Sequence, residues 1–346
     1  MWEQSLVHSP FAIQRQTNIV SAVFFYRKPQ QHRKKHTMLS NKSKQHLIAL
    51  AMLTVTTIIW GAGFALSSTM VGAGGSFEHL PHFSNVLRFG LASIVLVAVF
   101  FKKLKTNWQT IWHSMVGAVF MYGGFALQLL GLKYTTAASC GFFTAAYVMF
   151  VPFIAWAWQR KAPRIITWCG VGVAVIGLII FNGTNYQDTP TAALGNMLSL
   201  IGALVLAFQI TWTEYCLSKN KVDNVNLTVW QVVFSTVLFV GTSLVFEGKD
   251  LVTYVPQIHW ASCWWKIAII SLGGTAFAYV SQTYAQKHLT SSETSLIMVC
   301  ESPIGALISV LLGRDLFTWQ LAVGGLLIIT AVFMVEIIPS LLAKKE

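Results

Sequence analysis

Charged residues are scarce in this sequence. Only 10% of its 346 residues are Asp, Glu, Lys or Arg, whereas 55% are hydrophobic; an ordinary soluble domain has about 25% charged residues. A soluble chain of this length needs more charge to cover its surface. The apolar residues come in runs of about twenty, the length at which a helix crosses a hydrocarbon core of about 30 Å. The composition therefore excludes an ordinary soluble domain and predicts an all-α integral membrane protein.

Several chemical motifs are also missing. The five cysteines are scattered and none forms a CxxC pair, so neither a disulfide framework nor a zinc site is indicated. No glycine-rich phosphate loop of the Walker or Rossmann type is present, so the chain has no nucleotide hydrolysis of its own. Histidines avoid the centres of the apolar runs and the carboxylates are unpaired, which counts against a membrane-embedded enzyme. We expect no catalytic residue, no metal and no cofactor.

Positive charge exceeds negative charge, giving a formal net charge of +12. Eight of the 24 Lys and Arg residues lie in the first 44 positions, and most others lie in short loops between apolar runs. This placement is typical of topology signals and contacts with anionic lipid. No aromatic and basic nucleic-acid module is visible, so we expect a lipid bilayer and no nucleic acid as partner.

A basic segment and ten apolar runs divide the chain. Residues 1–45 are polar and lack the order of a cleavable signal peptide. We expect them to form a disordered cytoplasmic tail, in which 1–37 are either part of the tail or an extension before a natural start at Met38. Short connectors, and no soluble domain, separate the candidate spans. They run over about 47–70, 83–101, 111–132, 138–158, 164–182, 193–217, 227–246, 262–285, 291–312 and 317–338.

The loops between these spans carry unequal positive charge. With the tail in the cytoplasm, the inner loops hold nine Lys and Arg residues and the outer loops at most four, excluding both termini. The positive-inside rule then predicts a cytoplasmic-membrane protein with both termini in the cytoplasm. An even number of spans fits this unequal distribution, because an odd number would not keep the positive loops on one side of the membrane. The inner residues are Lys102, Lys103, Lys105, Arg160, Lys161, Arg164, Lys219, Lys221 and Lys287; the outer ones are Lys133, Lys249, Lys266 and Arg314.

The two halves of the membrane part resemble each other. Pro152 precedes Trp168 by sixteen residues, and Pro303 precedes Trp319 by the same sixteen. LKYTTAAS, from Leu132, resembles QKHLTSSE further on, although its distance to the proline differs by three. We interpret this order as a duplication of five helices, with a first repeat over 46–186, a second over 187–340 and a short cytoplasmic C-terminus over 341–346.

Five is an odd number, so the second copy must enter the membrane from the opposite side. This predicts ten transmembrane helices as two inverted five-helix repeats. Such an architecture places a binding site near the midplane between the repeats, which can rock to expose it alternately.

The motifs along these spans resemble those of a known family. WGAGF at 60–64, LRFG at 87–90, GLKYTTAASCGFFTAAYVMFVP at 131–152, ESP at 301–303 and GRDLFTWQLAVGG at 313–325 are similar, in order and spacing, to the EamA-type drug/metabolite transporters. The resemblance covers about 47–340. It departs from the family where Ser302 separates Glu301 from Pro303, and where Trp212 lies late in its span. The resemblance implies a transporter, often an exporter, of small metabolites, amino acids or drugs, with ten helices in inverted repeats.

Glu301 is the leading candidate for a functional residue. An ionisable group inside a membrane costs about 2.5–3.5 kcal/mol on insertion scales, so it should face a partner or a cavity. A buried glutamate can hold a proton or pair with a cation. Pro303 removes the hydrogen bond that would reach Val299, so we expect a helix kink there; Pro152 marks a corresponding kink. The alternative is a structural ion pair of Glu301 with Arg88.

Three other ionisable residues lie in or beside the spans. Arg88 is closer to the outer face, where its fork of donors could bind a carboxylate or phosphate, or could reach the headgroups instead. Glu214 lies close to Lys219 and Lys221, which favours a solvated interfacial place. Glu336 lies near the inner end of the last span and can reach the interface.

Uncharged polar and aromatic residues complete a candidate pathway. Amides and hydroxyls would satisfy a polar solute, and aromatic faces would accept an apolar or cationic one; packing or interfacial anchoring is the alternative for each. Paired and closely spaced glycines, such as those at 61–63, 170–172 and 324–325, are expected to let helices approach closely. The pathway candidates besides Glu301 and Arg88 are Trp60, Gln128, Tyr147, Gln209, Trp212, Tyr279 and Gln282.

These features together predict a secondary transporter, and from the family resemblance an exporter, of a small organic solute by alternating access, with protons as a possible coupling ion. Two alternatives stay open, a receptor-like scaffold without solute flux and a membrane-embedded enzyme. A scaffold would have a sealed and dry interior. The sequence leaves the solute, the direction of transport and the oligomeric state undefined.

Overall fold

The structure is a computed structural model that describes residues 44–72, 74–160, 162–182, 190–311 and 317–342. The chain divides into two compact units, Met1–Ile48 and Ala49–Glu346. The first unit is described only from residue 44, where a helix begins, so the prediction of a disordered tail over 1–45 lies almost wholly outside the described residues. The predicted cytoplasmic C-terminus lies outside them from residue 343 onward.

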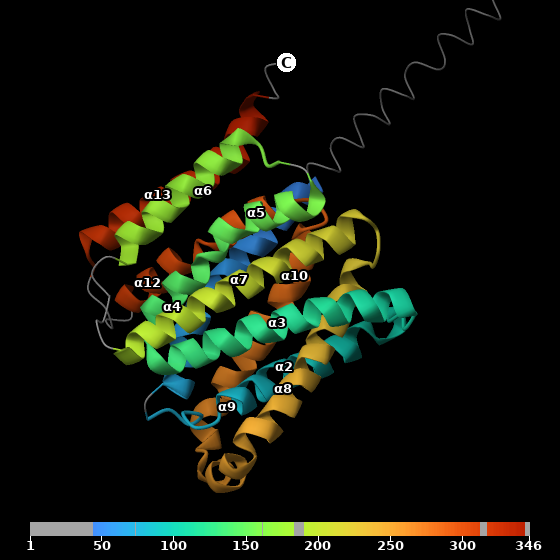
Figure 1. Ribbon diagram of the computed structural model, residues 1–346, viewed down its shortest axis with the longest axis vertical. Coiled ribbons are helices and arrows are strands. Elements are labelled where there is room, and N and C mark those ends of the chain that lie inside the picture. The colour runs from blue at the N-terminus through green and yellow to red at the C-terminus, as the bar shows by residue number, and fades with distance from the viewer. Residues whose placement is uncertain (1–43, 73, 161, 183–189, 312–316, 343–346) are drawn as a thin grey trace, which may run out of the picture. The chain divides into compact units, whose positions relative to one another are not determined.

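The described residues form ten helical spans, as the sequence predicts, and contain no strand. Figure 1 shows how these spans are arranged. Seven are long and apolar enough to cross a membrane, two more contain shorter apolar helices, and α11 with α12 forms the remaining span. Two short 3-10 turns, η1 (Phe101–Lys103) and η2 (Val255–Gln257), follow α2 and α8. The spans are the first helix (Lys44–Val71), α2 (Pro81–Phe100), α3 (Trp108–Tyr134), α4 (Ala137–Ala145) with α5 (Tyr147–Gln159), α6 (Ile165–Asn182), α7 (Pro190–Ser218), α8 (Asn224–Tyr254), α9 (Trp260–Ala268) with η3 (Ile269–Phe277) and α10 (Ala278–Ala285), α11 (Ser291–Met298) with α12 (Glu301–Leu311), and α13 (Trp319–Leu342).

Polar residues define where several helices begin. The Thr136 hydroxyl accepts from the backbone N–H of Ser139 at the start of α4. Thr290 does the same for Glu293 at the start of α11, and Glu293 accepts in return from the backbone N–H of Thr290, which forms a capping box. Such caps satisfy N–H groups that have no partner inside the helix. Thr136 and Thr290 are 154 positions apart, so the caps mark equivalent points of the two halves.

The fourth and ninth spans are interrupted midway, the former at Ala146 and the latter between Met298 and Glu301. The second break fits the expected effect of Pro303, because the Val299 carbonyl is left to the closer backbone N–H of Ser302 at 3.3 Å. The first break differs from the prediction, because α5 continues through Pro152 and the span is interrupted six residues earlier. A kink at Pro152 itself stays a prediction.

The seventh span is longer than predicted. The sequence places its end at residue 246, where charged residues follow, yet α8 continues to Tyr254. Glu247 explains the difference, since its carboxylate accepts from the backbone N–H groups of His82 and Phe83 at 2.7 and 2.8 Å and from the Ser243 hydroxyl at 2.9 Å. A carboxylate with these partners, only 4% exposed, continues the helix instead of ending it.

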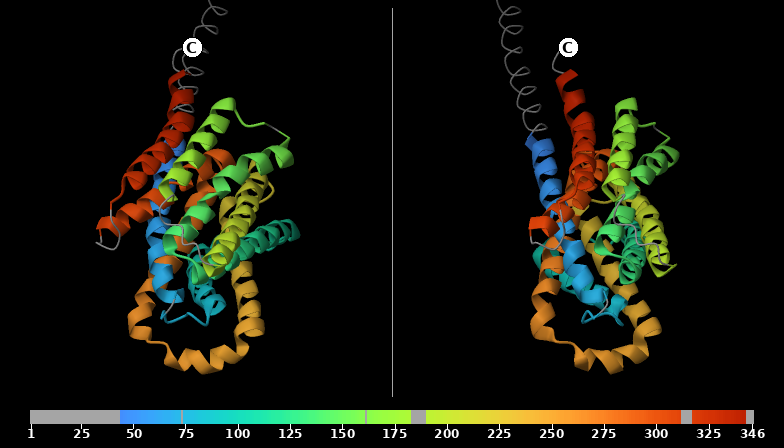
Figure 2. Two further views of the ribbon diagram at one scale, coloured as in Figure 1. Left: turned by 60° about the vertical axis from the view of Figure 1, so that its left-hand side comes forward. Right: turned by 90° about the vertical axis from the view of Figure 1, so that its left-hand side faces the viewer.

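Several contacts between the two halves join equivalent helices. The fifth span, α6, lies along the tenth, α13, and the second, α2, lies along the seventh, α8 (Figures 1 and 2). The fourth and ninth spans also touch, through α5 with α11 and α4 with α12. Contacts between equivalent elements are expected where a twofold axis relates two repeats. Because each half has five spans, an odd number, the chain forms two inverted five-helix repeats.

Glycines allow the closest helix contacts, as predicted for several of them. A Cβ added at Gly324 of α13 would lie 2.6 Å from the Gly177 carbonyl of α6, and one added at Gly61 would lie 2.7 Å from the Glu301 carbonyl. Small residues of this kind let membrane helices approach where no hydrophobic force drives them together. Gly63 and Gly172 differ, because nothing lies within 4 Å of an added Cβ.

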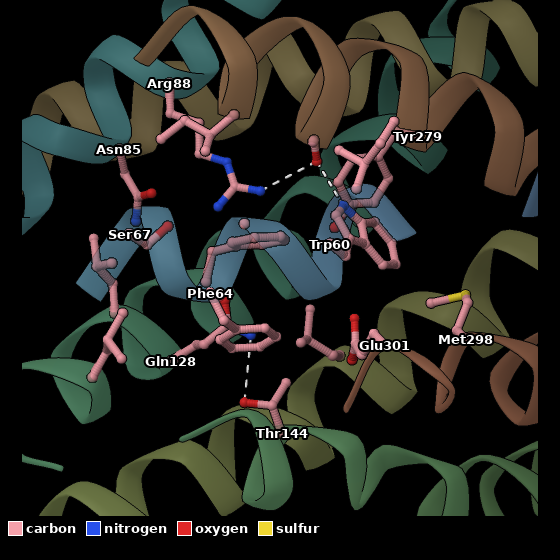
Figure 3. Close-up of a pocket in the computed structure, with 18 of the residues that line it drawn as sticks. Trp60, Phe64, Ser67, Asn85, Arg88, Gln128, Thr144, Tyr279, Met298 and Glu301 are labelled. Carbon is pink, nitrogen blue, oxygen red and sulfur yellow. Dashed lines mark hydrogen bonds between the residues drawn. The ribbon is translucent and has the colours of Figure 1, made fainter. Parts of the chain in front are cut away.

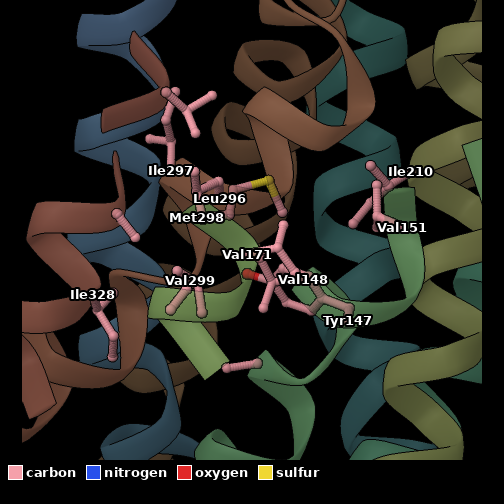
Figure 4. Packing of buried hydrophobic residues seen from close by; sticks show 14 of the residues in the cluster. Tyr147, Val148, Val151, Val171, Ile210, Leu296, Ile297, Met298, Val299 and Ile328 are labelled. Carbon is pink, nitrogen blue, oxygen red and sulfur yellow. The ribbon is translucent and has the colours of Figure 1, made fainter. Parts of the chain in front are cut away.

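A buried apolar cluster surrounds the interrupted helices. Val148 and Val151 of α5 pack with Leu296 and Met298 of α11 and with Ile328 of α13 (Figure 4). The outward faces of the spans are also apolar, with many exposed Leu, Ile, Val and Phe side chains, as expected for helices whose surroundings are lipid. This cluster holds the two breaks against each other.

Candidate functional site

A cavity lies between the two halves of the bundle. The first helix, α2, α3, α4 and α5 of the first half contribute to its wall, as do α7, η3, α10, α11 and α12 of the second. The centre of a water molecule can occupy about 60 Å³ of it, several times the ~10–15 Å³ that one water requires. Eight of the nine pathway residues predicted from the sequence line this cavity: Trp60, Arg88, Gln128, Tyr147, Gln209, Tyr279, Gln282 and Glu301.

Arg88 extends from α2 into this cavity (Figure 3). Its Nε donates to Thr275 Oγ1 at 2.8 Å and its Nη2 donates to the Gly274 carbonyl at 3.2 Å. The guanidinium carbon also lies 4.6 Å from the centre of the Phe125 ring, within the range of a cation–π contact. Arg88 is buried, which favours the binding alternative over contact with lipid headgroups.

The Gly274 carbonyl accepts a second hydrogen bond, from a side chain of the first helix. The indole Nε1 of Trp60 donates to the same carbonyl at 2.7 Å, and Figure 3 shows both donors converging on it. Gly274 lies in η3, a π-helical stretch in which the Thr275 hydroxyl donates five residues back to Ile270 at 3.1 Å. π-helical turns are rare and occur frequently at functional sites. Here the turn joins the second span, the first helix and the eighth span at one carbonyl.

Glu301 and Tyr147 meet on the opposite side of the cavity. Each is the first residue of a half-helix, α12 and α5 respectively, and the Tyr147 hydroxyl donates to Glu301 Oε1 at 3.1 Å. Both are buried, with 3% and 2% of their surface exposed. A carboxylate at a helix N-terminus is stabilised by the helix dipole. The two breaks thus bring an acid and its donor together at the cavity wall.

Arg88 and Glu301 do not form the structural ion pair that the sequence allows. Both have neutral partners, Thr275 and the Gly274 carbonyl for Arg88 and Tyr147 for Glu301. In the described ranges neither has an oppositely charged partner. The cavity therefore holds one cation and one acid that are free to meet a solute.

Side-chain amides occupy the remaining polar positions. Gln128 Nε2 donates to Thr144 Oγ1 at 3.4 Å (Figure 3), and Gln282 Nε2 donates to Gln209 Oε1 at 3.3 Å. Gln209 in turn donates to Gln231 Oε1 at 3.4 Å. Gln231 Nε2 and Gln282 Oε1 are buried without a hydrogen-bond partner among the described residues. Among the amides that line the cavity, the long bonds of Gln128 and Gln282 and the unpartnered Gln282 Oε1 indicate groups that water or a solute can satisfy.

Equivalent positions of the two repeats line the cavity together. Tyr147 and Glu301 are 154 positions apart, the same spacing that separates the helix-capping threonines. Gln128 and Gln282 share this spacing, as do Phe125 and Tyr279, whose ring centres lie 6.1 Å apart. The cavity is thus built around the relation between the repeats.

Trp212 is the exception among the predicted residues. Its Nε1 donates to the His113 carbonyl at 2.8 Å, and its ring packs near those of Trp158 and Tyr215. It lies almost one turn beyond Gln209 on α7 and does not line the cavity. Trp212 lies late in its span, which is also where the sequence departs from the family motif. At this position its side chain lies beyond the residues of α7 that line the cavity.

Glu214 also differs from its prediction. It is buried instead of solvated, and its Oε2 accepts from the backbone N–H of Ser291 at 2.8 Å and from the Ser291 hydroxyl. It therefore caps the start of α11. The positive charges of Lys219 and Lys221, which suggested an interface, follow it along the chain without defining its contacts.

Several residues that line the cavity were not predicted from the sequence. Ser67, Asn85, Thr144 and Met298 line the wall. Asn85 could have been found, because it lies three residues before Arg88 and so shares a helix face with it. The described ranges contain no group of three or more His, Cys, Asp or Glu residues placed to hold a metal ion.

Comparison with known proteins identifies the family. The EamA-like transporter family matches residues 47–183 and again residues 193–337. The chain belongs to the EamA-like transporter family. The two matches coincide with the two halves of the bundle, so each half corresponds to one EamA unit, and the protein is a multi-pass membrane transporter of this family.

Similar proteins share this architecture without defining a solute. An uncharacterized transporter of Archaeoglobus fulgidus is 24% identical over 290 residues, covering 82% of this chain and 84% of the relative. The uncharacterized transporter YoaV of Bacillus subtilis is 19% identical over 293 residues, covering 83% and 96%. A protein of known crystal structure matches 88% of this chain and 98% of its own length with a TM-score of 0.67 at 16% identity, which shows the fold alone.

Proposed function

We propose that this EamA-like protein is a secondary transporter, and specifically an exporter, of a small organic solute across the cytoplasmic membrane by alternating access. The observation that carries the proposal is the cavity between the repeats, in which Arg88 and Glu301 are buried without pairing with each other. Leaving a cation and an acid unpaired in a membrane is costly. A solute that contacts both would offset that cost, whereas a scaffold without flux would have no use for either.

The charged loops support the orientation in this proposal. Positive residues concentrate on the side that would hold both chain ends, which supports a cytoplasmic location for both termini. The sequence contains no nucleotide-binding loop, so an ion gradient is the proposed energy source.

Glu301 is the proposed coupling residue. Its carboxylate lines the cavity and has a single hydrogen-bond donor, Tyr147, among the described residues. An acid in this setting can exchange a proton as water reaches the cavity from one side and then the other. Protonation and solute binding would then compete for the same oxygen atoms.

The test begins with a solute found by screening deletion and overexpression strains against amino acids and drugs. Purified protein in proteoliposomes should move that solute faster when a pH gradient is imposed. Glu301→Gln keeps the shape of the side chain and removes its charge, so transport should lose its response to the gradient.

Glu293→Gln is the matched control, because Glu293 lies in the capping box of α11, away from the cavity, and a glutamine can fill the same capping role. An unchanged gradient response in the Glu301→Gln protein would remove Glu301 from coupling. Absence of any flux, with the protein folded, would favour the scaffold alternative.

A further inference from the structure

Three hydrogen-bonding side chains gather at the Arg88 end of the cavity. Ser67 of the first helix and Asn85 and Arg88 of α2 all line it, and Figure 3 shows them as neighbours, with Glu301 beyond Phe64 on the other side. Asn85 and Arg88 are three residues apart in a helix and therefore project in similar directions. Their chemistry differs from that of the Glu301 end, where an acid and a phenol meet.

Arg88 retains most of its hydrogen-bonding capacity. A guanidinium carries five N–H donors, and two of them are used by Thr275 and Gly274. The other three have no partner in the part of the chain that the structure describes. The two bonds to the eighth span and the Phe125 ring fix the orientation of the group, so that the free donors are held in place before any ligand arrives.

Asn85 and Ser67 add two more polar groups. Asn85 is 2% exposed and its Nδ2 is buried without a hydrogen bond in the described ranges. Ser67 is 8% exposed and lines the cavity beside it. An amide can turn to exchange its nitrogen and oxygen, because the two ends have nearly the same shape. The amide and the hydroxyl can therefore both donate to an oxygen atom beside Arg88.

The charges around the cavity define the sign of the ligand. The titratable side chains in its wall are Arg88, Tyr147, Tyr279 and Glu301, and the one carboxylate among them accepts from Tyr147. Near Arg88 no acid compensates the guanidinium among the residues described. Burying a cation without a partner is strongly unfavourable, so an anionic group of the solute is the missing element at this end.

We propose that Arg88, Asn85 and Ser67 form a subsite for a carboxylate group of the transported solute. This inference rests on the proposed transport function and deepens it by naming a chemical class. A planar carboxylate matches the fork of a guanidinium and accepts two parallel N–H bonds, while the amide and hydroxyl satisfy its remaining lone pairs. A phosphate monoester carries about −1.5 to −2 charges and would need a second cation, which the described wall lacks.

The experiment measures binding instead of transport. The purified protein is heated with matched probes, namely amino acids, their carboxamides and inorganic phosphate, and ligand binding is read as a rise in the unfolding temperature. At least one carboxylate probe should stabilise the native protein, and its carboxamide should bind at least about tenfold more weakly, as expected for loss of a charged hydrogen-bonded pair. Phosphate should have no effect.

Variants separate the subsite from a structural role of Arg88. Arg88→Gln and Asn85→Ala should each weaken the carboxylate probe, the former by about tenfold or more, and Arg88→Lys should restore part of the affinity. Lys249→Gln, at an exposed position of α8, is the charge-matched control and should bind normally. If Arg88→Gln shifts the unfolding temperature without ligand but leaves carboxylate affinity unchanged, Arg88 is a brace only and the proposal fails.

Three other outcomes would also overturn the subsite. They are equal binding of carboxylate and carboxamide, preferential binding of phosphate, and no stabilisation by any carboxylate in a protein that still transports its solute. Carboxylate binding that follows this pattern, in a protein that shows no flux, would refute the transport function and leave the subsite standing.

Discussion

The cation and the acid of the cavity are each held by neutral groups. Arg88 is fixed by a threonine and a backbone carbonyl, and Glu301 by a tyrosine. The guanidinium is therefore positioned without an acid beside it, and the carboxyl group of Glu301 is positioned without a cation beside it. This arrangement leaves both groups available to a ligand.

Buried carboxylates also serve the bundle outside the cavity. Glu247 joins α8 to the start of α2, and Glu214 joins α7 to the start of α11. In both cases the carboxylate satisfies backbone N–H groups at a helix N-terminus, where negative charge is favoured. These residues stabilise helix contacts and do not line the cavity.

Replacing Glu247 with glutamine should destabilise the protein. One of the two oxygens that accept from His82 and Phe83 becomes an amide nitrogen, so a buried backbone N–H loses its partner at a cost of about 1–3 kcal/mol. Thermal unfolding in detergent measures the loss, and hydrogen exchange should quicken at the start of α2. Asp250→Asn, one turn further along α8, is the control; an equal loss there would contradict the assigned role.

The sequence predicted individual cavity residues well where charge or spacing singled them out. Arg88 and Glu301 are conspicuous because ionisable groups are rare in apolar runs. Trp212 misled because an aromatic residue near a membrane boundary has several uses. The role of Glu247 was not predicted, because a charged residue after an apolar run indicates the end of a helix. Its contact with α2, which shows that the helix continues, is visible only in the structure.

At the scale of helices, the breaks matter more than the prolines. A new half-helix begins after the break at Ala146, and another begins after the break that precedes Glu301. The first residues of these half-helices, Tyr147 and Glu301, are joined by a hydrogen bond. The sequence singled out Pro152 and Pro303, whereas the interruptions lie at Ala146 and between Met298 and Glu301. Proline excludes a hydrogen bond locally, while the place where a helix yields depends on packing around it, which local sequence does not contain. The π-helical turn of η3 escaped prediction for the same reason.

The contact between α6 and α13 depends on two glycines that face each other. A Cβ at Gly324 would lie 2.6 Å from both the Gly177 carbonyl and Phe181 Cβ, so Gly324→Ala must push the helices apart. We expect a loss of about 1–3 kcal/mol in unfolding free energy, typical of overpacking. Gly172→Ala, with open space around the new methyl, should leave stability unchanged or slightly raised. Equal effects of the two substitutions would show that helix propensity, and not the close approach, decides the outcome.

At the scale of the whole molecule, short similar segments of sequence predicted the duplication. The spacing from Pro152 to Trp168 recurs from Pro303 to Trp319, and the threonines that cap α4 and α11 lie within the similar segments. The charge of the loops agreed with an even number of spans. The sequence could not show which positions of the two copies meet, since that requires the fold to bring Tyr147 to Glu301.

The inverted arrangement makes a simple prediction about the chain ends. Ten spans return the chain to the side where it started, and the positive loops predict that this side is the cytoplasm. Reporter fusions at the N-terminus and after residue 346 should both report a cytoplasmic location, and a fusion in the loop after α8 should report the opposite side. Ends on different sides would contradict both the number of spans and the inverted repeat.

The register between the repeats shifts by three residues after the breaks, since Tyr147 precedes Pro152 by five positions and Glu301 precedes Pro303 by two. Identical copies would give two degenerate conformers, one facing each compartment with equal free energy. In the proposed alternating-access cycle, a difference in register between the copies makes the two conformers unequal in free energy. We therefore predict unequal half-saturation concentrations of the solute on the two faces, an inequality that by itself cannot drive net accumulation.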